Sequence, residues 1–99
     1  MNLKQLQQLV DDDWQNNSKM KPTPEQKLLF VIEEFGEVAE AIRRLSKDGG
    51  DHKTARDDLG SEFADFLISV ITLANDYDID LESELDAFWV KLSQRRQQP

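Results

Sequence analysis

The fold is decided by the stretch LLFVIEEFGEVAEAIRRL, residues 28–45. Its apolar residues recur every three or four positions, which is the spacing of one face of a helix. Glutamates also lie at the edge of that apolar face, where a carboxylate is costly unless it is paired or binds a cation. The apolar stripe is centred on Leu28, Ile32, Phe35, Ala39 and Ile42, and it is widened by Val31, Val38 and Leu45.

The start of this helix is marked by a capping pattern. Thr23 is a candidate N-cap, Pro24 suits the first helical position, and Gln26 completes a capping box. We expect the helix to run to about Lys47 and to stop at Gly49-Gly50.

Three further helices are predicted, and no segment has a convincing strand pattern. One runs over about residues 2–14 and is followed by a polar linker. Another covers about residues 54–75, and the last follows Asp80, a plausible N-cap. The sequence therefore predicts an all-α, four-helix bundle-like fold, with residues 1–99 forming a single domain.

Composition excludes several classes of protein. Lysine and arginine total 12 against 20 acidic residues, and the net charge of −8 argues against a nucleic-acid groove or an anionic membrane surface. No cysteine is present, so disulfides and thiolate metal sites are excluded. With no apolar run long enough to span a bilayer and no signal-peptide pattern, we expect a cytoplasmic location.

Two short acidic motifs lie on consecutive predicted helices. Glu34 and Glu37 are three residues apart, as are Glu62 and Asp65, and this spacing places each pair on one helix face. A short loop would make the two helices antiparallel neighbours, so four carboxylates would surround one small volume. Such a cluster is repulsive unless a hard divalent cation fills it, and all-oxygen sites suit Mg²⁺ or Mn²⁺.

The helix predicted over residues 54–75 is apolar around most of its circumference, which is typical of a buried helix. One narrow polar line runs along it. Taken alone, that line is most simply a solvent-exposed seam, whereas pairing with the preceding helix makes it part of a site. Its residues are Asp58, Glu62, Asp65, Ser69, Thr72 and Asp76.

A cation held by carboxylates from two helices suggests a reaction. Phosphate oxygens of a nucleotide can occupy its open coordination positions, and a water held nearby can attack the polarised phosphorus atom. That reaction is phosphoanhydride hydrolysis. Glu33, the nearest spare carboxylate, is a candidate to orient or deprotonate the water.

The two motifs together resemble a known signature. Glu33-Glu34-Phe35-Gly36-Glu37, 24 intervening residues and then Glu62-Phe63-Ala64-Asp65 are similar to the EExxE…ExxD pattern of the MazG-like nucleotide pyrophosphohydrolases. These belong to the all-α NTP pyrophosphatase superfamily, with dimeric dUTPases and dCTP pyrophosphatases. The resemblance is strongest from Thr23 to Leu73, and it departs from the family at Ala64, where glycine is frequent.

The resemblance implies an enzyme that cleaves an NTP, in particular a dNTP, into the monophosphate and pyrophosphate, for house-cleaning or control of nucleotide pools. Glu34, Glu37, Glu62 and Asp65 match the family's Mg²⁺ ligands. Glu33 matches the first glutamate of the motif, whose role is less settled. Members of this kind are homo-oligomers, dimers or dimers of dimers, with active sites near subunit interfaces.

Three other residues are candidates for substrate binding. Trp14 is either an amphipathic core or interface residue, or a stacking surface for the nucleobase, since relatives carry an aromatic residue in a similar position. Lys91 and Arg95 share a face of the last helix. They either complement the helix dipole or contact phosphate.

A different class of function remains open. The chain could be a non-enzymatic helical module that oligomerises or binds a partner helix, with its acidic lines simply solvated. In either case, Trp14, Phe88 and Trp89 add large apolar area that 99 residues cannot easily cover. The sequence therefore predicts a homo-oligomer, a dimer or a tetramer.

Overall fold

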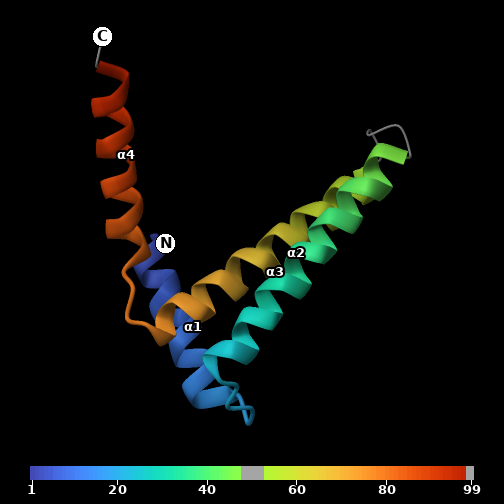
Figure 1. Ribbon diagram of the computed structural model, residues 1–99. Helices are drawn as coiled ribbons and strands as arrows, with labels where there is room; N and C mark the ends of the chain where they lie inside the picture. The colour runs from blue at the N-terminus through green and yellow to red at the C-terminus, as the bar shows by residue number, and fades with distance from the viewer. Residues whose placement is uncertain (48–52, 98–99) are drawn as a thin grey trace.

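The computed structural model describes residues 1–47 and 53–97, and these residues form four α-helices and no strand (Figure 1). The prediction of an all-α, bundle-like fold is confirmed. The predicted helix stop at Gly49-Gly50 lies outside the described residues. Over the described parts of the chain, no helix has the length and apolar character needed to cross a membrane. The helices are α1 (Leu3–Asn17), α2 (Pro24–Lys47), α3 (Lys53–Asp76) and α4 (Leu81–Gln97).

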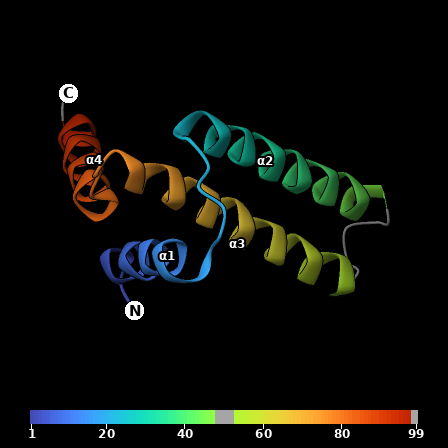
Figure 2. The ribbon, with the colours of Figure 1, turned by 90° about the horizontal axis from the view of Figure 1, so that it is seen from below.

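The helices α2 and α3 form a long antiparallel hairpin, and they lie side by side in both views (Figures 1 and 2). Between them, α2 buries Val38 and Ala41, while Ile71 of α3 is fully buried. The rings of Phe35 and Phe66 meet edge to face, with their centroids 5.9 Å apart. This hairpin brings the two acidic motifs opposite each other.

Side-chain caps set two of the helix starts as predicted. The backbone N–H of Gln26 donates to Thr23 Oγ1 at 3.2 Å, and the N–H of Thr23 donates to Gln26 Oε1 at 2.8 Å. At the start of α4, Asp80 accepts from the backbone N–H of Ser83 at 3.2 Å and from its hydroxyl at 3.0 Å. Each cap satisfies donors that the first helical turn leaves without partners.

The first helix is longer than predicted, and it ends at Asn17 rather than at Trp14. The prediction stopped at the last apolar residue, but a helix continues through polar residues when its side chains support the turn. Here the Asn17 amide donates to Asp13 Oδ1, one turn earlier, at 2.9 Å.

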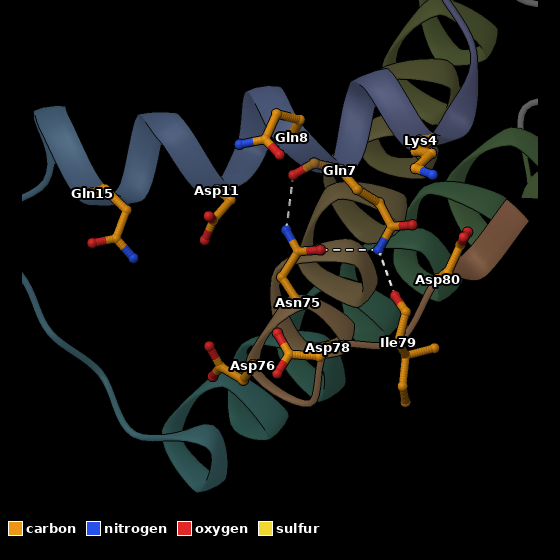
Figure 3. A pocket seen from close by; sticks show the side chains of 10 residues that line it. All are labelled: Lys4, Gln7, Gln8, Asp11, Gln15, Asn75, Asp76, Asp78, Ile79 and Asp80. Carbon is orange, nitrogen blue, oxygen red and sulfur yellow. Dashed lines mark hydrogen bonds between the residues drawn. The ribbon is translucent and has the colours of Figure 1, made fainter.

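Two amide side chains fasten α1 to the end of α3 (Figure 3). The Gln7 side-chain amide donates to Asn75 Oδ1 and to the carbonyl of Ile79, each at 2.9 Å. Asn75 donates in return to the Gln7 carbonyl at 3.0 Å, and Gln7 Oε1 accepts from the Leu81 N–H at 3.0 Å. A buried Gln7 therefore ties together α1, the end of α3 and the start of α4.

The apolar faces are less covered within this chain than the sequence predicts. The face of α2 that packs on α3 is not the centre of the predicted apolar stripe but the face next to it. Leu28, Ile32, Phe35 and Ile42, at the stripe centre, therefore remain exposed. The prediction that α3 is a buried helix is wrong for the single chain, because Phe63 and Leu67 are each 51% exposed. The reason is that, among the described residues, α3 packs mainly against α2 and α1, while α4 stands away from the hairpin and contacts mainly α1 (Figure 1).

We expect Gln7→Leu to lower the free energy of unfolding by about 2 kcal/mol, because it strips partners from Asn75 and from the Leu81 N–H. Chemical denaturation at a fixed protein concentration measures this. Gln8→Leu is the matched control, since Gln8 is exposed and its amide bonds only to the neighbouring turn, at Asp12. An equal effect of the two substitutions would contradict this account of how α1 is attached.

Candidate functional site

Three carboxylates converge where α2 faces α3. One carboxylate oxygen from each of Glu34, Glu62 and Asp65 lies within 4.8 Å of the other two. Glu34 comes from α2, and the other two residues lie one turn apart on α3. Glu34 and Glu62 are half-buried, and Asp65 is exposed at the rim. The arrangement is open enough to admit a ligand and close enough for the three charges to repel one another.

The electrostatics of the cluster act most strongly on Glu34. Partial burial against α3 raises the pKa of its carboxyl group above the ordinary value, and the negative charges of Asp65 and Glu62 raise the pKa further. Glu37 and Glu33 add smaller effects in the same direction. Both causes destabilise the charged carboxylate, and a bound cation would remove the repulsion.

The other two glutamates of the first motif are placed differently. Glu37 is exposed and is not among the three clustered carboxylates, although its charge acts on Glu34. Glu33 lines a separate hollow of about 500 Å³ beside the linker, together with Lys21, Pro22 and Phe30. Of the three glutamates in the first motif, Glu34 therefore lies in the carboxylate cluster, Glu37 lies beside it, and Glu33 faces the separate hollow.

A cleft of about 470 Å³ adjoins the cluster. Glu34 and Asp65 line one part of it, and Trp14 and Asp13 of α1 line another. The cleft thus joins the acidic cluster to an aromatic surface. Its remaining walls come from Lys27 and Phe30 of α2 and from Ile68, Ser69 and Thr72 of α3.

Trp14 is anchored in this cleft. Its indole Nε1 donates to Thr72 Oγ1 at 3.2 Å, and that hydroxyl donates to the carbonyl of Ile68 at 2.8 Å. Thr72 is buried, and Ser69 of the same polar line is half-buried. Reading this line as a solvent-exposed seam is therefore wrong for Ser69 and Thr72, because α1 packs over that part of α3.

Lys27 is a residue of the cleft that sequence reasoning missed. Its ammonium group lies 2.7 Å from Asp76 Oδ1, and its side chain is only 11% exposed. A lysine within an amphipathic helix usually extends to solvent, so the residue type alone gave no signal that Lys27 lines a cleft. Its spacing did give one, because Lys27 precedes Glu34 by seven positions, which is two helical turns on the same face.

The two cations predicted for phosphate contact lie elsewhere in this chain. Lys91 and Arg95 belong to α4, and neither is among the described residues that line the cleft beside the acidic cluster. Within one chain, the structure does not bring them to the three carboxylates.

A second, more polar cleft of about 650 Å³ lies between α1 and the turn that joins α3 to α4 (Figure 3). Asp11, Asp78 and Asp80 give it an acidic lining, and Asp78 has a positive φ of 54°. The Gln7 and Asn75 amides in its wall bond to each other. Because the hydrogen bonds of those amides hold α1 in place, the attachment of α1 explains why they line this cleft.

The donor set of the three-carboxylate cluster fits a hard divalent cation. Oxygen ligands are what Mg²⁺ and Mn²⁺ prefer, and Mg²⁺ commonly takes only one or two carboxylates while keeping waters and substrate phosphates. Glu34, Glu62 and Asp65 would hold it, and the charge of Glu37 also acts on Glu34.

The raised pKa of Glu34 predicts a pH dependence of stability in the metal-free protein. A carboxyl group whose pKa is higher folded than unfolded stabilises the fold below the unfolded value, and this contribution is lost as pH rises through the folded value. In chelator, Glu34→Gln should therefore weaken the loss of stability on going from acid to neutral pH. Denaturation midpoints across that range measure it.

Glu40→Gln is the control for that experiment, because it removes from the same helix a carboxylate whose pKa is shifted in the opposite direction. The Arg43 guanidinium hydrogen-bonds to Glu40 and lowers the pKa of that carboxyl group. Its contribution is present above the unfolded pKa and is lost on acidification, so the control should shift the profile in the other direction. Matching profiles for the two variants would contradict the assignment.

Comparison with known proteins is consistent with this geometry. Neither a curated protein nor a solved structure gives a significant match to the chain. A family model does match: that of the MazG nucleotide pyrophosphohydrolase domain, over residues 22–98, which includes both acidic motifs and α2, α3 and α4. The match covers more than half of the sequence, and the chain therefore belongs to the MazG nucleotide pyrophosphohydrolase domain family.

Proposed function

We propose that this chain is a Mg²⁺-dependent pyrophosphohydrolase that cleaves a nucleoside triphosphate between the α- and β-phosphates, releasing the monophosphate and pyrophosphate. The observation that carries the proposal is the meeting of Glu34, Glu62 and Asp65 within 4.8 Å across two helices. Family membership supports the reaction class. Mn²⁺ satisfies the same oxygen donors and is the natural substitute.

Each residue of the site has a distinct task in this proposal. Glu34, Glu62 and Asp65 hold the cation, which when bound neutralises phosphate charge and polarises the phosphoryl group. Glu37, exposed beside the cluster, is proposed as a further ligand for the cation or for its water shell. Glu33 lines the other hollow, and its predicted role in orienting water stays a prediction.

The cleft beside the cluster is proposed to receive the nucleoside. A nucleotide whose phosphates lie at Glu34 and Asp65 can place its base toward Trp14, since all three residues line the same cleft. Aromatic stacking accepts any base, so this surface provides affinity rather than a choice of base. A dNTP is the proposed substrate, and control of cytoplasmic nucleotide pools is the proposed role.

The test is product analysis with a panel of NTPs and dNTPs in Mg²⁺. The expected products are pyrophosphate and the monophosphate, and Asp65→Asn should lower the rate by at least about 100-fold because it replaces an anionic ligand of the cation by a neutral amide. In chelator, the same variant should be as stable as the parent protein or more so, since one charge leaves a repulsive cluster. Mg²⁺ should raise the thermal midpoint of the parent and raise that of the variant much less.

Asp57→Asn is the matched control for that experiment. Asp57 lies on the same helix but is exposed and pairs only loosely with Lys53, at 3.5 Å. It should keep both turnover and the response to Mg²⁺. Release of inorganic phosphate and a diphosphate would place the cleavage elsewhere and refute the proposal. An absence of turnover without any Mg²⁺ response would favour the non-enzymatic helical module.

We also propose that the chain works as a homo-oligomer, a dimer or a tetramer. The support is the exposed apolar surface of Leu28, Ile32 and Phe35 on α2 and of Phe63 and Leu67 on α3. We propose that these exposed apolar side chains make up the apolar patch through which the chains associate. On α4, Leu85, Phe88, Trp89 and Val90 are exposed as well.

Light scattering at low micromolar concentration tests the assembly, with a multiple of the 11.5 kDa chain mass expected. Ile32→Glu should shift the mass toward one chain, because it places a charge within the apolar patch. Arg44→Glu, at an exposed position on the same helix, is the control and should leave the mass unchanged. A single-chain mass for the parent protein with full activity would refute the proposal.

A further inference from the structure

Lys27 occupies an unusual position for a lysine. The residue is 9% exposed, and its ammonium group lies 2.7 Å from Asp76 Oδ1 at the far end of α3. Burying an ammonium group is unfavourable unless a carboxylate compensates for the lost hydration. Asp76 therefore fixes where the Lys27 ammonium can lie, and it joins the start of α2 to the end of α3.

The same ammonium group lies over an aromatic ring. The distance from Lys27 Nζ to the centroid of the Trp14 ring is 5.4 Å, within the range of a cation–π contact. The indole also has an edge contact, since Trp14 Nε1 donates to Thr72 Oγ1 at 3.2 Å. One hydrogen bond leaves the ring free to tilt about that bond. A cation over the ring face restricts the tilt.

The indole and the groups that hold it come from three helices beside the acidic cluster. Lys27 is on α2, Trp14 is on α1, and Thr72 and Asp76 are on α3. Lys27, Trp14 and Thr72 line the cleft together with Glu34 and Asp65. The orientation of the indole relative to the carboxylates is therefore set by groups outside the cluster itself.

We propose that Lys27, held by Asp76, is a positioning residue that fixes the indole of Trp14 so that its opposite face receives the nucleobase. This inference rests on the proposed function. Lys27 acts here through Trp14 rather than by contacting phosphate, because its ammonium group is already paired and largely enclosed. In this proposal, Lys27 influences the affinity for the substrate but takes no part in the chemical step.

The first experiment reads the indole without any substrate. In a Trp89→Phe background, Trp14 is the only tryptophan, so its fluorescence reports this one ring. Lys27→Met keeps the length and apolar stem of the side chain but removes the charge. We expect higher accessibility of Trp14 to acrylamide and lower emission anisotropy, whereas Lys27→Arg should restore both values toward those of the parent.

Kinetics in the otherwise unaltered protein separate positioning from chemistry. Lys27→Met should raise KM for the triphosphate about three- to tenfold and leave kcat within about twofold, the signature of lost binding. Lys27→Arg should recover most of the KM. Asp76→Asn keeps the lysine but frees it, and it should give an intermediate KM. This variant also tests the inference if Lys27→Met does not fold. Lys47→Met, at an exposed position on the same helix, should change neither parameter.

Several outcomes would overturn the inference. A folded Lys27→Met protein with unchanged Trp14 fluorescence would show that Lys27 does not hold the ring. A fall in kcat with an unchanged KM would make Lys27 a participant in the reaction. If the parent protein hydrolyses no triphosphate, the proposed function fails. The fluorescence comparison still decides whether Lys27 orients Trp14.

Discussion

The repulsion among Glu34, Glu62 and Asp65 is the constraint on which the rest of the site depends. Three carboxylates within 4.8 Å of one another oppose the pairing of the helices that carry them. The packing of α2 on α3, through Val38, Ala41 and Ile71, must offset that repulsion. Partial burial, and after it the charges of Asp65 and Glu62, raise the pKa of Glu34, and a bound cation would turn the same charges into an attraction.

The first helix converts an acidic cluster into a cleft. Gln7 and Asn75 hold α1 against the end of α3, and Trp14 lies seven positions further along the same face of α1. Because that attachment and the Trp14 contact to Thr72 are two helical turns apart, the direction of α1 is fixed along the cleft wall. An aromatic surface is then held at a set place relative to the carboxylates.

Charge and apolar surface are divided between different parts of the molecule. The acidic cluster and its cleft use the inner faces of α1, α2 and α3, while the outer faces of the hairpin and much of α4 carry exposed apolar side chains. The same two helices therefore carry both a polar site and exposed apolar surface. The helical period allows this, because residues one position apart lie about 100° apart around the axis.

The sequence by itself determined the helices, their caps and the pairing of two acidic motifs. Periodicity and capping residues are local properties, so Thr23, Gln26 and Asp80 could be assigned without the fold. The motifs likewise required only spacing along a helix to place Glu34, Glu62 and Asp65 on faces that could meet. Glu33 and Glu37 show the limit of this reasoning, because neighbours within one motif turn to different surfaces.

Only the tertiary structure decided which faces meet and which remain exposed. The stripe centred on Leu28, Ile32 and Phe35 is the most apolar face of α2, yet α2 packs on α3 through the neighbouring face. The partner of Lys27 is 49 positions away at Asp76, and that of Trp14 is 58 positions away at Thr72. Spacing along a chain specifies a direction around one helix axis, whereas these contacts depend on the rotation and crossing of separate helices, which only their mutual packing sets.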